Sequence, residues 1–295
     1  MKLEKIITLA SRGVRLRFLA KERSLRAAGC DLPLWVIPYD GDRFDLPSHA
    51  TWWEDSELID WLDRWSSRPV MRKYQCLTTA NYQFVDADVC FLQDPATVLE
   101  AHTGFVTSCG HWHNPGETVT EQSLAYARTQ TTVWQSRCFN TGQFACDRRL
   151  YSFADLRAMA EQPDCRGTCL ELPYHEQPGL NLLVWRSGIP VTNLTLPPVN
   201  MESTWAGDYP EAYGQYWSDR GLQPYLIHWA GLRMDVSRPI DDLFLRLLTQ
   251  EERREWDVAA KAATHRKRSR ARSLWEIFRR ARRAVRSFAA AFRGE

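Results

Sequence analysis

The chain has no apolar stretch that approaches the roughly 20 residues of a membrane-spanning helix. Its amino terminus, residues 1–7, lacks the apolar run of a secretory signal peptide. None of its 8 cysteines forms a Cys-x-x-Cys pair, a spacing typical of zinc and dithiol sites. From these absences we expect a reduced, cytoplasmic protein without a spanning helix.

Acidic residues are scarce only at the end of the chain. Residues 261–295 contain 12 basic residues (Lys and Arg) and 2 acidic residues (Asp and Glu). The rest of the chain contains 26 basic and 34 acidic residues. An acidic body argues against a nucleic-acid partner, so none is expected. The 295 residues, 44% hydrophobic, are enough for one large folded domain. We place its boundary near residue 260, which gives a domain of residues 1–260 and a basic tail of residues 261–295.

Short apolar runs alternate with helical patterns along the body. Strands are expected at residues 5–11, 34–39, 82–92, 104–109, 143–146 and 191–196, and helices at 15–28, 56–65, 70–80, 152–161 and 178–185. This alternation predicts an α/β fold with a mainly parallel sheet that helices cover on both faces. Ligands of such sheets bind beyond the carboxyl ends of the strands.

Two carboxylates lie in the apolar run Tyr-Gln-Phe-Val-Asp-Ala-Asp-Val-Cys-Phe-Leu, at Asp86 and Asp88. Burying two unpaired carboxylates is expensive, because each must be neutralised or find a counter-charge. A divalent cation is one such counter-charge, and oxygen ligands suit Mg²⁺ or Mn²⁺. The alternative is that Asp88 or Asp94 caps the next helix while Asp86 pairs with an arginine.

Three further segments follow in order. They are Phe139-Asn140-Thr141-Gly142, His175-Glu176-Gln177-Pro178-Gly179-Leu180-Asn181 and His228-Trp229-Ala230-Gly231. With Asp86-Ala87-Asp88 they span roughly residues 5–231. This ordered set resembles the retaining glycosyltransferases of the nucleotide-diphospho-sugar transferase (GT-A) fold, the group of glycogenin and bacterial lipooligosaccharide galactosyltransferases.

The resemblance implies a metal-dependent glycosyltransferase whose catalytic domain is residues 1–260. It implies that Asp86, Asp88 and His228 hold Mn²⁺ or Mg²⁺, and that Glu176 and Gln177 stabilise the sugar centre during transfer with retention. The nucleotide-diphosphate sugar, with UDP favoured, would meet Ala10, Ser11, Arg12, Lys73, Asp86, Asn140, Gly231 and Arg233. Two departures stand out. Glu176 replaces the usual aspartate, and Arg233 stands near the position of the usual lysine after Gly231.

Several of these residues have a plainer explanation. Lys73 is equally compatible with a solvated lysine on a helix face, and His228 with a hydrogen-bonded core histidine. Cys109, His111 and His113 suggest zinc, but the two histidines would point to opposite sides of an extended chain. An active-site loop that contacts donor or acceptor explains residues 109–113 better. Trp205 could stack on a sugar or pack within its loop.

Two other functions compete. A sugar nucleotidyltransferase of the same fold would need a glycine-rich phosphate loop near the amino terminus, and residues 10–15 contain one glycine. A non-catalytic sugar-binding or membrane-scaffolding protein could keep the fold without the reaction.

The tail has apolar residues at helical spacing with arginines on the flanks. The stripe consists of Leu274, Ile277, Phe278, Ala281, Val285, Phe288, Ala289 and Phe292. Such a helix suits the surface of an anionic membrane, which we expect residues 266–293 to contact. This places the protein on the inner face of the membrane, beside a glycan or lipid-linked acceptor. Docking of the stripe on the body or on a second subunit, or RNA binding by the tail, are the alternatives.

Overall fold

The computed structural model describes residues 1–66, 68–172, 176–211, 213, 214, 217, 223–233 and 236–262. The chain divides into two compact units. The first comprises Met1–Leu232 and Arg238–Leu247, and the second Arg233–Ser237 and Leu248–Glu295. In the second unit, residues 250–262 are helical. No helix within the described ranges is both long and apolar enough to cross a membrane.

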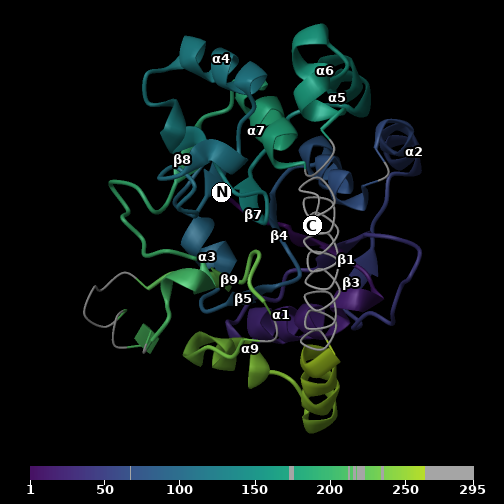
Figure 1. Cartoon of the computed structure of the whole chain (residues 1–295), viewed down its shortest axis with the longest axis vertical. Coiled ribbons are helices and arrows are strands. Elements are labelled where there is room, and N and C mark those ends of the chain that lie inside the picture. Colours follow the sequence, from purple (N-terminus) through teal and green to yellow (C-terminus); the bar gives the residue numbers. More distant parts are fainter. Residues whose placement is uncertain are drawn as a thin grey trace, which may run out of the picture. The chain divides into compact units, whose positions relative to one another are not determined.

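A seven-stranded sheet forms the centre of the first unit (Figure 1), in the order β3-β2-β1-β4-β7-β6-β8. Its strands are β1 (Lys5–Ala10), β2 (Leu34–Pro38), β3 (Ala50–Trp52), β4 (Tyr82–Val85), β6 (Phe105–Thr107), β7 (Gln143–Cys146) and β8 (Val191–Asn193). Neighbouring strands are parallel except around β7, which runs antiparallel to both β4 and β6. The expected mainly parallel α/β sheet is therefore confirmed.

Helices flank this sheet. They are α1 (Arg15–Ala27), α2 (Ser56–Trp65), α3 (Pro95–Leu99), α4 (Glu121–Gln130), α5 (Phe153–Ala160), α6 (Pro163–Cys169), α7 (Gln177–Arg186) and α9 (Asp242–Leu245), with the 3₁₀ helix η2 at Pro69–Thr78. Polar side chains begin several of them: Asp55 accepts a hydrogen bond from the Leu58 amide, and Ser152 accepts one from the Asp155 amide. These caps satisfy amides that the first helical turn leaves without partners.

Apolar residues bury both faces of the sheet. On one face, Ile7, Phe84 and Phe144 pack with residues of α2, η2 and α7. On the other face, Ile6 and Val85 pack with residues of α1. Figure 1 accordingly shows α1 on one side of the sheet and α5, α6 and α7 on the other. Because side chains of a strand alternate between faces, neighbouring Ile6 and Ile7 enter different layers.

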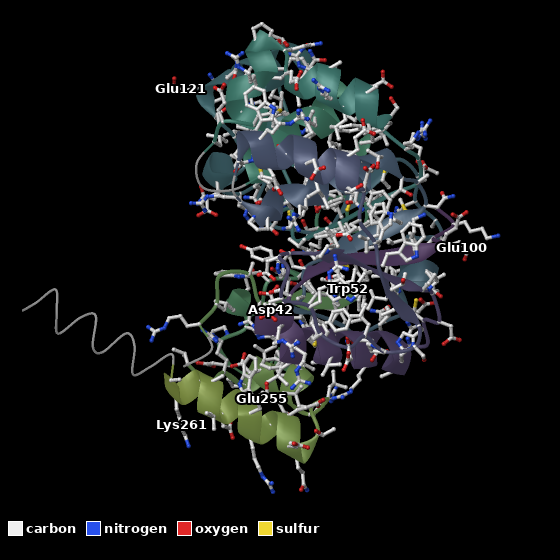
Figure 2. The ribbon with its side chains drawn as sticks, turned by 90° about the vertical axis from the view of Figure 1, so that its right-hand side faces the viewer. Asp42, Trp52, Glu100, Glu121, Glu255 and Lys261 are labelled. Atoms are coloured by element: carbon white, nitrogen blue, oxygen red, sulfur yellow. The ribbon has the colours of Figure 1, made fainter. Side chains whose placement is uncertain are left out.

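Figure 2 shows the same unit with its side chains. Glu121, at the start of α4, lies at one end of the unit, and Asp42 and Trp52 lie in the part that carries α1.

The expected strand at residues 82–92 is two strands. β4 ends at Val85, and β5 (Val89–Phe91) pairs antiparallel with β9 (Leu226–His228) in a separate two-stranded sheet. The Asp86 amide still donates to the carbonyl of Gly142, 2.8 Å away and in register with the β4–β7 pairing, so the chain leaves β4 only after this bond. The expected helix at 70–80 is also different, because η2 is a tighter 3₁₀ helix.

Candidate active site

The strand break brings Asp86, Asp88 and His228 together. Asp86 follows β4 directly, and the pairing of Val89 with His228 places the histidine opposite the start of β5. One ligand atom from each of the three residues lies within 4.8 Å of the others. The Nε2 atom of His228 lies 3.4 Å from Asp88 Oδ1 and 3.8 Å from Asp86 Oδ2. These are the three side chains that the resemblance assigned to a metal.

Gly142 makes this convergence possible. A Cβ atom at this position would lie 2.1 Å from His228 Cε1 and 2.7 Å from Asp86 Oδ2, distances that no side chain tolerates. The absence of a side chain therefore leaves room for the carboxylate and imidazole to meet. Two carboxylates and one imidazole are donors that suit Mn²⁺ or Mg²⁺. The three residues thus fit a divalent ion, whose identity the geometry does not select.

Each carboxylate also has a basic partner. Lys73 is buried, and its Nζ lies 3.0 Å from Asp86 Oδ1 and 2.8 Å from Glu176 Oε1. Arg17 of α1 places Nη1 3.0 Å from Asp88 Oδ2. The solvated-lysine explanation of Lys73 is therefore wrong. The helix-cap alternative is confirmed for Asp94, which caps α3 by accepting a hydrogen bond from the Ala96 amide. Its other part is wrong, because Asp86 pairs with Lys73, and the arginine, Arg17, pairs with Asp88.

Burial and these charges raise the pKa of one of the three acids and lower the pKa of the other two. Burial raises the pKa of Asp86, although Lys73 and His228 oppose the shift. Burial also pushes the pKa of Asp88 upward, but the His228 hydrogen bond and the charge of Arg17 hold it well below its ordinary value. Glu176 is buried too, and its ion pair with Lys73 lowers its pKa. Glu176 is consequently a carboxylate at neutral pH.

The start of α7 is tied to the loop before β7. Gln177 Oε1 accepts a hydrogen bond from the Thr141 amide at 3.2 Å, and its Nε2 donates to the carbonyl of Glu117 at 3.2 Å. Thr141 Oγ1 donates to Glu176 Oε1 at 2.6 Å. Asn181, one turn further along α7, bonds both backbone groups of Phe139. The spacing of the two sequence motifs thus has a structural cause, because each motif holds the other in place.

Asn140 stabilises the same loop. Its Oδ1 accepts from the Gly142 amide at 2.7 Å, and its own amide donates to the Cys109 sulfur at 3.1 Å. Burial raises the pKa of the Cys109 thiol, but its hydrogen bond with His111 outweighs this and lowers the pKa overall. Among the described residues, the group of three candidate metal ligands is Asp86, Asp88 and His228, and Cys109 is not in it. The zinc alternative for residues 109–113 finds no support there.

The site opens into two adjoining cavities. The central cavity, about 470 Å³, is lined by most of the predicted residues: Lys73, Asp86, Asp88, Asn140, Glu176, Gln177, His228 and Gly231. The strand-edge cavity, about 260 Å³, is lined by Ala10, Ser11, Arg17, Tyr39, Lys73, Asp86 and Asp88, among others. Because both cavities share Lys73, Asp86 and Asp88, they adjoin at the strand ends, and we call the two together the groove.

Two predicted residues are not among those that line the two cavities. The Arg12 side chain is exposed to solvent and lines neither cavity. It donates hydrogen bonds to Asp42 Oδ1 at 2.9 Å and to the carbonyl of Arg43 at 2.6 Å. Arg233 belongs to the second compact unit, so its contact with a diphosphate stays a prediction.

Sequence reasoning missed three residues of the site. Arg17 reaches Asp88, while Glu117 and Thr141 hold Gln177 and Glu176. Thr141 was the unassigned position inside a motif already recognised, so a signal for it existed. Arg17 and Glu117 had none, because nothing in the local sequence distinguishes them from surface residues.

Comparison with known proteins supports the fold. No family model matches the sequence, and no curated protein matches it. Among solved structures, the galactosyltransferase LgtC in complex with donor and acceptor sugar analogues is similar, with a TM-score of 0.54, 14% identity, and coverage of 85% of this chain and 99% of that one. An active-site mutant of LgtC, in which glutamate replaces a glutamine, gives a TM-score of 0.50, 11% identity, and coverage of 84% and 99%. The chain therefore has a GT-A-type glycosyltransferase fold.

Proposed function

We propose that the protein is a metal-dependent glycosyltransferase that moves a sugar from a nucleotide-diphosphate donor to a glycan or glycolipid acceptor with retention. The observation that carries this proposal is the convergence of Asp86, Asp88 and His228 beside Glu176 and Gln177, at the strand ends of a fold shared with a galactosyltransferase. LgtC was solved with donor and acceptor sugar analogues, and the altered residue of its active-site mutant is a glutamine, as Gln177 is here.

The shape of the groove supports a nucleotide-sugar. The strand-edge cavity has apolar walls at Leu9, Val14 and Tyr39, which suit a flat base, and it meets Asp86 and Asp88 at its other side. The central cavity then offers Glu176 and Gln177 to the sugar. We assign the nucleotide to the strand-edge cavity, the diphosphate to the junction, and the transferred sugar to the central cavity.

Asp86, Asp88 and His228 would hold Mn²⁺ or Mg²⁺ at this junction. The ion, when bound, would supply positive charge to the departing diphosphate. Arg17 lies at the same junction and can exchange its bond with Asp88 for one with a phosphate oxygen, since Arg binds both groups in the same geometry. Lys73 stays enclosed between Asp86 and Glu176 and orients both carboxylates.

Glu176 and Gln177 would act on the sugar. Glu176 is ionised and hydrogen-bonded, so it stabilises positive charge at the anomeric carbon and does not donate a proton. Gln177 is fixed at both ends of its amide by Thr141 and Glu117. The acceptor hydroxyl attacks the face that the diphosphate leaves, and a departing phosphate oxygen takes its proton. No protein base is required in this scheme.

One observation favours a second candidate, a non-catalytic sugar-binding protein of the same fold. Lys73 and Arg17 already supply positive charge to Asp86 and Asp88, although Lys73 shares its charge with Glu176. A protein of this fold that binds sugar without a metal ion could have the same contacts among Lys73, Arg17, Asp86 and Asp88. Measurement of turnover separates the two candidates.

The test is hydrolysis of the donor in the absence of acceptor. Purified full-length protein is incubated with a panel of nucleotide-diphosphate sugars, UDP-sugars first, and with Mn²⁺. We expect slow release of the sugar from at least one donor, and none in excess chelator. Asp88→Asn is the matched control, because it keeps the shape of the side chain and loses its charge. Absence of hydrolysis with every donor, combined with retained sugar binding, would favour the non-catalytic candidate.

A further inference from the structure

A third cavity, of about 280 Å³, lies between the loop that follows β6 and the segment that follows β8. We call it the loop cavity. Its walls include Trp112 and His113 from the first segment, and Asn200, Glu202 and Asp208 from the second. None of its lining residues lines the central or the strand-edge cavity. The proposed donor site therefore leaves this space unexplained.

The walls of the loop cavity are held in place. The indole Nε1 of Trp112 donates a hydrogen bond to Thr195 Oγ1 at 3.1 Å, which links the two segments. The indole also packs against the ring of His113. On the other wall, Ser203 Oγ donates to Asp208 Oδ2 at 2.5 Å. The cavity thus has an aromatic ring on one segment and the Asp208 carboxylate on the other, and a carboxylate can accept several hydrogen bonds.

The chemistry of the walls selects the class of ligand. Glu202 and Asp208 bring negative charge, and the described residues that line the cavity include no lysine or arginine, so a phosphate or nucleotide is disfavoured. Within the described ranges, the loop cavity supplies no group of three metal ligands, so it is not a metal centre. Its volume lies just below the roughly 300–1,000 Å³ of pockets that enclose drug-sized ligands. One uncharged sugar ring satisfies all three conditions, since its C–H face packs on an aromatic ring and its hydroxyls donate to carboxylates.

Both walls continue into the central cavity. Glu117 lies in the same loop as Trp112, lines the central cavity and accepts the hydrogen bond of Gln177. In the other segment, the carbonyl of Thr204 accepts from the His228 amide at 2.7 Å, and Trp205 Nε1 donates to the carbonyl of Ala230 at 3.0 Å. The two segments that form the loop cavity thus also contact residues of the central cavity, so an acceptor longer than one sugar could extend from the central cavity along them.

We propose that the loop cavity binds a second, uncharged sugar ring of the acceptor, next to the ring whose hydroxyl is glycosylated. The acceptor then contains at least two sugar rings, and Trp112, Glu202 and Asp208 select it. This inference rests on the proposed function, because it assumes that the central cavity is where the sugar is transferred.

The experiment measures binding of simple glycosides to the full-length protein. Methyl glycosides of glucose, galactose and N-acetylglucosamine, and disaccharides built from them, are titrated in the presence of UDP and Mn²⁺ by calorimetry or saturation-transfer NMR. At least one disaccharide should bind about tenfold more tightly than its monosaccharide, the gain expected from one well-packed aromatic contact. Trp112→Ala should remove that preference, and Asp208→Asn should reduce it several-fold. Trp65→Ala, a partly exposed tryptophan that lines none of the three cavities, should keep it.

Three results would overturn the proposal: equal affinity for mono- and disaccharides, no binding of any glycoside, or an unchanged preference in Trp112→Ala and Asp208→Asn. If Trp112→Ala does not fold, as judged by its thermal midpoint, the exposed Asp208→Asn decides alone. Donor hydrolysis separates this inference from the proposed function. A disaccharide preference that depends on Trp112 without any donor hydrolysis would support the loop cavity and refute transfer, and the reverse result would refute the loop cavity alone.

Discussion

Two lysines of the first unit are almost completely buried, yet their surroundings differ. Lys73 of η2 and Lys21 of α1 lie on opposite faces of the sheet, with 3% and 1% of their surface exposed. Lys73 contacts Asp86, Glu176 and the carbonyl of Thr141. Among the described residues, Lys21 Nζ has no hydrogen-bond partner, and it lies 4.9 Å from the ring centroid of Phe18.

The pKa values of the two amines shift in opposite directions. Burial lowers the pKa of Lys21 to about 7, against an ordinary value of 10.5. Burial acts on Lys73 as well, but Asp86 and Glu176 outweigh it and raise its pKa. Burial of a lysine therefore does not by itself indicate a functional site. The partners do: Lys73 stays charged because it joins two acids of the groove, whereas Lys21 avoids its desolvation penalty by losing its proton.

The largest effect is expected from removing Lys73. Lys73→Met leaves Asp86 and the buried Glu176 without their shared counter-ion, so the free energy of unfolding should fall by about 3–5 kcal/mol. Donor hydrolysis should disappear as well. Denaturant unfolding measures the first and sugar release the second. The double variant Lys73→Met with Glu176→Gln should recover part of the lost stability. A single variant as stable as the wild type would show that the ion pairs do not hold the site.

On the Lys73 side of the sheet, substitutions of His228 and Gln177 should impair different steps, nucleotide binding and turnover respectively. His228→Ala removes a metal ligand and should weaken Mn²⁺-dependent UDP binding by about tenfold or more. Gln177→Ala should leave UDP binding largely intact and lower turnover by roughly 10²-fold, because its proposed role is at the sugar centre. Calorimetry with UDP and a turnover assay separate the two. An equal loss of UDP binding in both variants would mean that Gln177 acts on the nucleotide and not on the transferred sugar.

On the other side of the sheet, Lys21→Met should stabilise the protein near pH 7. Between pH 7 and about 10 the unfolded chain binds a proton at Lys21 that the folded chain does not, so this residue makes stability rise with pH by up to about 1.4 kcal/mol per unit. Lys21→Met should lose that contribution and gain on the order of a few kcal/mol at pH 7. Unfolding curves at pH 7, 8 and 9 for wild type and variant give the difference. Parallel slopes would mean that Lys21 stays charged in the fold.

The smallest effect on the body is expected from deleting the tail. Residues 263–295 lie outside the described part of the chain, so the membrane interpretation rests on the sequence pattern and stays a prediction. Truncation after residue 264 should leave the thermal midpoint and donor hydrolysis nearly unchanged. It should abolish sedimentation with anionic vesicles, to which each basic residue near the surface contributes about 1 kcal/mol. If the truncated body aggregates or melts much earlier, the apolar stripe belongs to the core.

Lys73 and Lys21 also illustrate which features could be predicted from the sequence, because local patterns were readable and distant contacts were not. Local periodicity predicted most strands and helices, and Asp86, Asp88 and His228 were identified from short motifs alone. The separate strand β5 was not predictable, because it depends on pairing with β9 across more than 130 residues. The ion pairs of Lys73 and Arg17 depend on such distant contacts too. The same sequence pattern, a lysine on an amphipathic helix, produced opposite environments at residues 21 and 73.

Calorimetric titration of UDP tests the central claim, a divalent metal centre formed by Asp86, Asp88 and His228, most directly. The wild-type protein is titrated with UDP in Mn²⁺ and again in excess chelator, and Asp88→Asn is titrated in Mn²⁺. We expect binding in Mn²⁺, its loss in chelator, and comparable loss in Asp88→Asn. Undiminished UDP binding in chelator would contradict the central claim, because Arg17 and Lys73 would then supply the positive charge without a metal ion.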